Sequence, residues 1–126
     1  MGAKHKHFDP VNDLTVFMVE GKVPARDYEK TIHDFYHEGP LTKNVLRDLS
    51  LSELNHLERS DIVLISLTPR PFLAQGKGGK TAVAASSDPA FGLAKRYEFS
   101  STMDMLPFEV SIFRSTGEAM KWLTGE

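Results

Sequence analysis

The chain has 126 residues, of which 40% are hydrophobic and 25% charged, with a formal net charge of -2 at pH 7 and no cysteine. This composition is typical of one folded domain that buries a core without disulfide bonds, and it excludes thiol catalysis, Cys-ligated zinc and a general attraction to nucleic acid or anionic membranes. No apolar run reaches the length of a membrane span and residues 1–7 are polar and basic, so we expect a cytoplasmic protein without a signal peptide or transmembrane anchor.

The first predicted element is a β-hairpin. The turn-forming residues 10–13 separate Lys6–Asp9 from the apolar run Leu14–Glu20, and the two segments are expected to pair as its arms. The polar terminus, residues 1–7, is expected to be mobile.

A helix and a strand follow the hairpin. Pro24 is expected to start the helix, and Gly39-Pro40 to stop it. Three apolar residues at helical spacing form its buried stripe: Tyr28, Ile32 and Phe35. The next predicted strand is Asn44–Leu49, with Asp48 near its carboxyl end.

The segment Ser60–Leu73 allows two interpretations. Its run DIVLISL has the β-branched content of a strand, whereas Ser60 is a good helix cap. A strand here would leave no crossover between parallel neighbours, so we favour a helix. Pro69 and Pro71 limit that helix to roughly two or three turns.

The stretch after the glycine-rich loop reads as a strand running into a helix. Thr81–Ala85 is small and apolar on both faces, which is typical of a strand buried in a parallel sheet. In the following Ser86-Ser87-Asp88-Pro89, Asp88 can cap the next helix and Pro89 suits its first position.

The last strand and helix complete the predicted fold. Glu109–Phe113 is the strand, Ser115 with Glu118 forms a capping box, and Gly125 ends the helix. The order is a hairpin, then α, β, α, β, α, β, α. It predicts one α/β domain, residues 1–126, with helices packed on a mostly parallel sheet of four or five strands.

The glycine-rich loop resembles a phosphate-binding P-loop in its amino-acid sequence but not in the secondary structure predicted around it. Residues 74–81, AQGKGGKT, carry Ala74 where the first glycine would stand. A P-loop needs a helix opening at its Lys-Thr end, because that helix N-terminus holds the phosphate, whereas Lys80 and Thr81 open a strand here. We therefore expect a connector that binds no nucleotide.

His33 and His37 have a spacing that could place two imidazoles on one metal ion. They share an outward helix face with Arg26 and Lys30, whose charge opposes a cation, and no third ligand is evident. A solvated helix face is the favoured interpretation, and we expect neither a metal nor another cofactor.

No catalytic constellation stands out. The chain lacks a Gly-x-Ser-x-Gly nucleophile elbow, and its acids are too scattered to be paired from the sequence. Several aromatic residues are most simply core, although some can line an apolar pocket in this fold class. These residues are Phe72, Phe91, Tyr97, Phe99, Phe108 and Phe113.

The hairpin start, the strand at Val45–Leu49, the block GKTAVAASSDPAFGLAKRYE and the ending FEVSIFRSTGEAMKWL together resemble the SpoIIAA-like family. That family belongs to the STAS group, named for sulfate transporters and anti-sigma-factor antagonists, and a related branch is described as Sec14-like. The resemblance implies a small α/β domain of the bacterial cytosol, in a group not known for catalysis.

The resemblance also implies a candidate site. Regulatory members of the STAS group carry a phosphorylated serine at the start of the helix after the second core strand, and Ser60 matches it by position. The spacing from the preceding strand is longer here and the motif's glycine is absent, so a plain helix cap is the alternative. The candidate recognition or phosphoacceptor residue is Ser60, with a surrounding surface of Asp48, Ser50, Asp61, Ser86, Ser87 and Asp88.

Three functions remain open. The first is a non-enzymatic protein-binding or regulatory module, whose partner is an unidentified protein or a second copy of the chain. The second is a carrier of a small apolar or lipid-like ligand, as the Sec14-like kinship allows. The weakest is an enzyme that uses the carboxyl ends of the strands, where Asp48, Ser50, Ser86 and Ser87 should cluster.

Overall fold

The computed structural model describes residues 2–39, 41–103 and 106–125. Within them the chain forms five strands, four α-helices and one 3-10 helix. In chain order these are β1 (Ala3–Asp9), β2 (Leu14–Glu20), α1 (Ala25–His37), β3 (Asn44–Asp48), α2 (Arg59–Leu67), η1 (Arg70–Gln75), β4 (Lys80–Ala84), α3 (Asp88–Met103), β5 (Glu109–Phe113) and α4 (Thr116–Thr124).

The sheet follows the order of the chain, β1-β2-β3-β4-β5. β1 pairs antiparallel with β2, and every later pair is parallel. Strands added in one direction through right-handed crossovers place their connecting helices on the same face of the sheet. The predicted single α/β domain with a mixed, mostly parallel sheet is confirmed.

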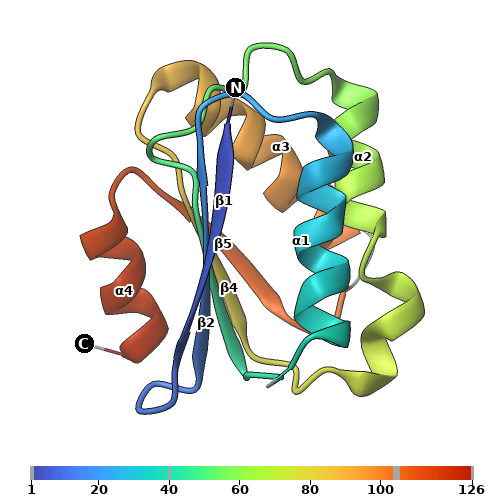
Figure 1. Cartoon of the computed structure of the whole chain (residues 1–126), viewed down its shortest axis with the longest axis vertical. Helices are drawn as coiled ribbons and strands as arrows, with labels where there is room; N and C mark the ends of the chain where they lie inside the picture. Colours follow the sequence, from blue (N-terminus) through green and yellow to red (C-terminus); the bar gives the residue numbers. More distant parts are fainter. Residues whose placement is uncertain (1, 40, 104–105, 126) are drawn as a thin grey trace.

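The helices make two unequal layers. α1, α2 and α3 cover one face and enclose the larger core cluster, whereas α4 alone covers the other face over Leu14, Leu46 and Ala82. Figure 1 shows this separation, with α4 on one side of the sheet and α1 and α2 on the other. The predicted stripe of Tyr28 and Ile32 on α1 is buried in the larger cluster.

β4 is buried on both faces, as its composition predicts, and runs from Lys80 to Ala84 rather than from Thr81 to Ala85. Its entry depends on Gly79, because a Cβ there would overlap the carbonyl group of Lys43. β3 likewise ends at Asp48, one residue before the predicted end.

Two helices are capped by residues other than the predicted Asp88 and Ser60. α3 includes Asp88, and the side chain that accepts a hydrogen bond from Ala90 N is that of Ser87, at 3.2 Å. The N-cap of α2 is Glu58, two residues before the predicted cap Ser60, and it forms a reciprocal capping box with Asp61. In both helices a neighbouring side chain reaches the free N–H groups of the first turn.

The other helix ends agree with the sequence where the structure describes them. Ser115 caps α4 and accepts from Glu118 N at 3.2 Å, and Gly125 ends it with a φ of 79°. Ser60–Leu73, favoured as helical, divides into α2 and the 3-10 helix η1. α1 has Glu38 as its C-cap, and the predicted stop at Pro40 falls outside the described residues.

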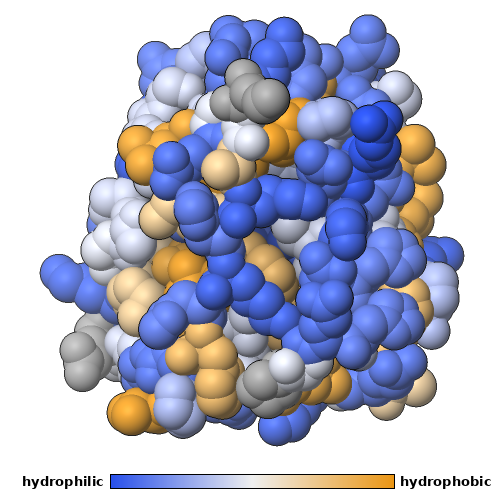
Figure 2. Space-filling model, in the orientation of Figure 1, coloured by the Kyte–Doolittle hydropathy of each residue, from blue (hydrophilic) through white to orange (hydrophobic). Residues whose placement is uncertain are grey.

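The amino-terminal strand is longer than predicted. Residues 3–7, expected to be mobile, pair with β2 from Ala3 opposite Glu20 onward. β1 is almost wholly exposed and carries Lys4 and Lys6, a composition that discourages edge-to-edge pairing with another sheet. Polar side chains accordingly cross the face seen in Figure 2. Among the described residues, no helix is long and apolar enough to cross a membrane.

Candidate functional site

Asp48 and Ser50 meet where β3 ends, as expected from the parallel topology. One carboxylate oxygen of the buried Asp48 accepts from Ser50 N at 3.1 Å and from Ser50 Oγ at 2.6 Å. The other accepts from Thr116 Oγ1 at 3.5 Å. These bonds join β3 to the start of α4, so Asp48 has a structural role.

Ser86, Ser87 and Asp88 lie nearby at the end of β4. Ser86 Oγ donates to the Ser50 carbonyl at 3.1 Å, while Asp88 forms an exposed ion pair with Arg114 at 2.6 Å. The Arg114 guanidinium also lies 4.1 Å from the centre of the Phe91 ring. The structure therefore brings together the part of the predicted surface that belongs to the strand ends.

Ser60 and Asp61 belong to the first turn of α2 and are separate from that cluster. Asp61 accepts from Glu58 N at 2.8 Å, and Ser60 is exposed. Within the described ranges, no hydrogen bond or ion pair connects Ser60 or Asp61 to Asp48, Ser50 or Ser86.

A different site lies between the sheet and helices α1, α2 and α3, and its central side chain is Arg47 of β3. Arg47 Nη1 donates to Thr31 Oγ1 of α1 at 2.8 Å, and the guanidinium carbon lies 5.3 Å from the centre of the Phe17 ring. Arg47 Nε is buried without a hydrogen-bond partner. Among the described residues, no carboxylate lies within ion-pair distance of Arg47.

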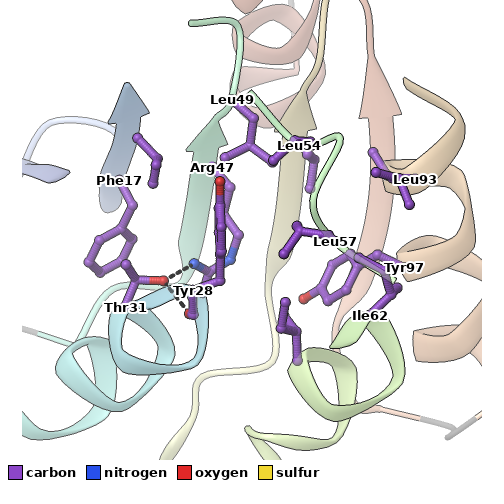
Figure 3. Close-up of a pocket in the computed structure, with 14 residues that line it drawn as sticks. Phe17, Tyr28, Thr31, Arg47, Leu49, Leu54, Leu57, Ile62, Leu93 and Tyr97 are labelled. Carbon is purple, nitrogen blue, oxygen red and sulfur yellow. Dashed lines mark hydrogen bonds between the residues drawn. The ribbon is translucent and has the colours of Figure 1, made fainter. Parts of the chain in front are cut away.

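Arg47 lines two cavities. The smaller, about 50 Å³, is almost entirely apolar (Figure 3). Figure 3 shows Arg47 near its middle, with Thr31 on one side and Tyr97 on the other. Its walls come from β2, β3, β4, the three helices and the loop before α2; they include Phe17, Leu49, Leu54, Leu57, Ile62, Ile65, Val83 and Leu93.

The larger cavity, about 270 Å³, shares Arg47 and Tyr97 with the smaller one. Exposed residues at its rim, including Lys77 and Pro107, connect it to the surface. Its walls are mostly apolar or aromatic: Ile32, Phe35, Tyr36, Val45, Pro69 and Phe108. The expectation that some aromatics line a pocket holds for Tyr97 and Phe108, whereas Phe99, also assigned to the core, is 66% exposed.

The charged side chains that the structure describes around the two cavities are all positive. The described lining residues include Arg47, Lys43 and Lys77 and no aspartate or glutamate. Burial lowers the pKa of Arg47, and the neighbouring hydroxyls of Tyr97 and Tyr36 partly oppose that shift. Burial also raises the pKa of Tyr36, so its hydroxyl stays neutral at physiological pH. The site is therefore a mostly apolar space that contains the Arg47 cation, and no described residue supplies an anion to pair with it.

The histidine pair on α1 lies outside these cavities. The rings of His33 and His37 stack with centres 6.1 Å apart, and each meets the Phe72 ring edge to face. No group of three or more potential metal-binding side chains occurs among the described residues.

Sequence reasoning missed Arg47 and Thr31. The available signal was the position of Arg47 in a central strand, because side chains on both faces of such a strand are buried. Val45 and Arg47 alternate with Leu46, so an arginine two residues after a core valine must point into the same layer.

No family model and no curated protein matches the sequence of this chain. A solved structure does match: an uncharacterised protein of the DUF3478 family with a SpoIIAA-like fold, from Shewanella loihica PV-4. The alignment covers 97% of this chain and 93% of that one, with 16% sequence identity and a TM-score of 0.55. This chain has a SpoIIAA-like fold. In this SpoIIAA-like domain, the candidate cavities lie on the three-helix face of the sheet.

Proposed function

We propose that this protein binds a small, largely apolar ligand between its sheet and helices α1, α2 and α3, and acts as a non-enzymatic carrier or sensor. The observation that supports this most is the pair of cavities that meet at Arg47 and Tyr97. Ligand sites are typically concave and apolar with a few fixed polar groups, and this space has that character.

The lining residues favour binding over acid–base catalysis. Those that the structure describes include no histidine, aspartate, glutamate or cysteine, the side chains that most often transfer protons or attack substrates near neutral pH. Their polar groups are instead arginine, lysine, threonine and tyrosine, which suit orientation of a bound molecule.

Native mass spectrometry of the protein purified from its own host tests this function. A co-purifying small molecule is expected, and a Thr81→Phe variant should lose it because Thr81 lies beside Val45 in the wall of the larger cavity. Val11→Phe is the matched control, since Val11 is 90% exposed in the hairpin turn. Equal retention by both folded variants would contradict the cavity as the binding site.

A second candidate function is protein binding through α2. Val63 and Leu64 of this helix are 41% and 55% exposed, and apolar surface is visible at the edge of the molecule where α2 lies (Figure 2). Ser60, exposed in the first turn, could change such a surface by gaining a phosphate, although Glu58 and Asp61 would repel the added charge.

The α2 proposal predicts that Ser60→Asp and Ser60→Ala fold equally well but differ in binding a protein that co-purifies with the wild type. Pull-down of that protein by both variants measures the difference. If both retain it as the wild type does, Ser60 has no regulatory role.

A further inference from the structure

We propose that the ligand is a small organic acid whose carboxylate pairs with Arg47 between the two cavities while its apolar body fills the larger one. This inference rests on the proposed function, because it names the chemical class of the molecule bound at that site. It is carried by the unfilled hydrogen bonding of Arg47 and by the charges around it.

The guanidinium of Arg47 has hydrogen-bond donors left for a ligand. An arginine side chain offers five N–H groups, and Arg47 donates one of them from Nη1 to Thr31 Oγ1, with the Tyr97 hydroxyl as a further polar neighbour. Nε is buried without a partner. Nε and Nη2 form one edge of the guanidinium plane, and that edge matches the two oxygens of a carboxylate.

The charges of the described lining residues favour an anionic ligand. Arg47 is half-buried, with its Nε fully buried. Withdrawing a cation from water without an anion is costly, and among the described residues the neighbours that support its charge are tyrosine hydroxyls rather than carboxylates. The cationic side chains of Lys43 and Lys77 also line the larger cavity. An anionic ligand would supply the missing partner, whereas a cationic ligand would be repelled from every charged group in the lining.

The volume of the larger cavity limits the size of the acid that it can hold. At about 270 Å³ the larger cavity is slightly below the volume usual for drug-sized ligands, so it suits one short chain or ring system rather than a lipid with two acyl chains. Lys43 and Lys77 are exposed, whereas Arg47 is the cation that both cavities share, so the inner part of the site balances one negative charge and favours a carboxylate over a doubly charged phosphate.

Isothermal titration calorimetry with octanoate and 1-octanol tests the assignment, because the two probes share an eight-carbon chain and differ in charge. The wild type should bind octanoate roughly tenfold or more tightly than 1-octanol, as expected when charged hydrogen bonds are added. Arg47→Met should remove this preference and still bind 1-octanol. Arg47→Gln is the second variant if Arg47→Met does not fold.

Lys121→Met is the matched control. It removes one positive charge from an exposed position on α4, on the opposite face of the sheet from the cavities, and should keep the preference for octanoate. Equal affinity of the wild type for both probes, or a preference that survives in both folded Arg47 variants, would overturn the inference and leave the proposed function standing. Failure of both probes to bind would overturn both. Tighter binding of octyl phosphate than of octanoate would exclude the carboxylate.

Discussion

Thr31 Oγ1 accepts a 2.8 Å hydrogen bond from Arg47 Nη1 and donates to the Tyr28 carbonyl at 2.7 Å. This pair links the centre of β3 to α1 inside the layer between sheet and helices. It holds Nη1 of Arg47, while the Tyr97 hydroxyl supports the guanidinium charge from the other side. Thr31 is therefore a positioning residue for the guanidinium.

Thr31→Val should lower the free energy of unfolding by about 1–3 kcal/mol, because it keeps the shape of the side chain but leaves a charged donor unpaired. Thr31→Ser keeps the hydroxyl and should lose clearly less. Urea denaturation of both variants measures the difference. Equal losses would mean that the bond does not contribute to stability.

Arg47→Met should raise the free energy of unfolding by about 1–3 kcal/mol, or leave it unchanged, because the substitution removes a buried charge that has no ion-pair partner in the described structure. Arg47→Lys, which keeps the charge but loses the planar donor edge, should not be stabilised. Thermal and urea unfolding of the ligand-free proteins compare the two. If the free energy of unfolding falls by several kcal/mol in Arg47→Met but not in Arg47→Lys, the interpretation of Arg47 as a cation without an anionic partner is wrong.

Asp48→Ala should destabilise the fold by about 1–3 kcal/mol, because it leaves Ser50 and Thr116 without their shared acceptor where β3 meets α4. Asp88→Ala is a suitable control, since its ion pair with Arg114 is exposed and should contribute little. Urea denaturation tests both. If Asp48→Ala is as stable as Asp88→Ala, the structural role assigned to Asp48 is wrong.

The buried Tyr28 hydroxyl should make the free energy of unfolding depend on pH in the alkaline range. Burial raises its pKa above the usual value of 10.0, although the Ser52 hydroxyl, which donates to the Val19 carbonyl, opposes the shift. Below about pH 10 both folded and unfolded states are protonated. As the pH rises further, the unfolded state ionises first, so the free energy of unfolding falls until the folded-state pKa is passed.

Tyr28→Phe should therefore lose less stability between about pH 9 and pH 11 than the wild type. At neutral pH it should be nearly as stable as the wild type, because the Tyr28 hydroxyl is buried without a hydrogen-bond partner. Parallel urea titrations at the two pH values measure the change. An identical alkaline loss in both proteins would show that Tyr28 does not cause it.

Much of this fold was predictable because local patterns and topology agree. The small apolar residues of β4 indicate a strand buried on both faces, and the need for a crossover identifies α2 as a helix despite its β-branched content. Cap positions were harder to predict, because Ser87 and Asp88 are both good caps and the geometry that selects Ser87 depends on where the backbone turns.

The candidate site was less predictable because it has no motif. Arg47, Thr31 and Tyr97 come from a strand and two helices far apart in the sequence, and their meeting is a result of packing. Ser60 was predicted as a recognition residue from a family resemblance. In the described structure it shares no hydrogen bond with the predicted residues at the strand ends. The strongest missed signal was a charged residue in a strand buried on both faces.

Locating bound octanoate by NMR, with methyl groups as reporters, tests directly whether the ligand binds between the sheet and helices α1, α2 and α3. We predict intermolecular nuclear Overhauser effects from the octanoate chain to Ile32 and Val45, which line the larger cavity, and none to the exposed Val63 and Leu64 of α2. Contacts confined to Val63 and Leu64, or an unperturbed Ile32 and Val45 at saturating octanoate, would contradict ligand binding between the sheet and its three helices.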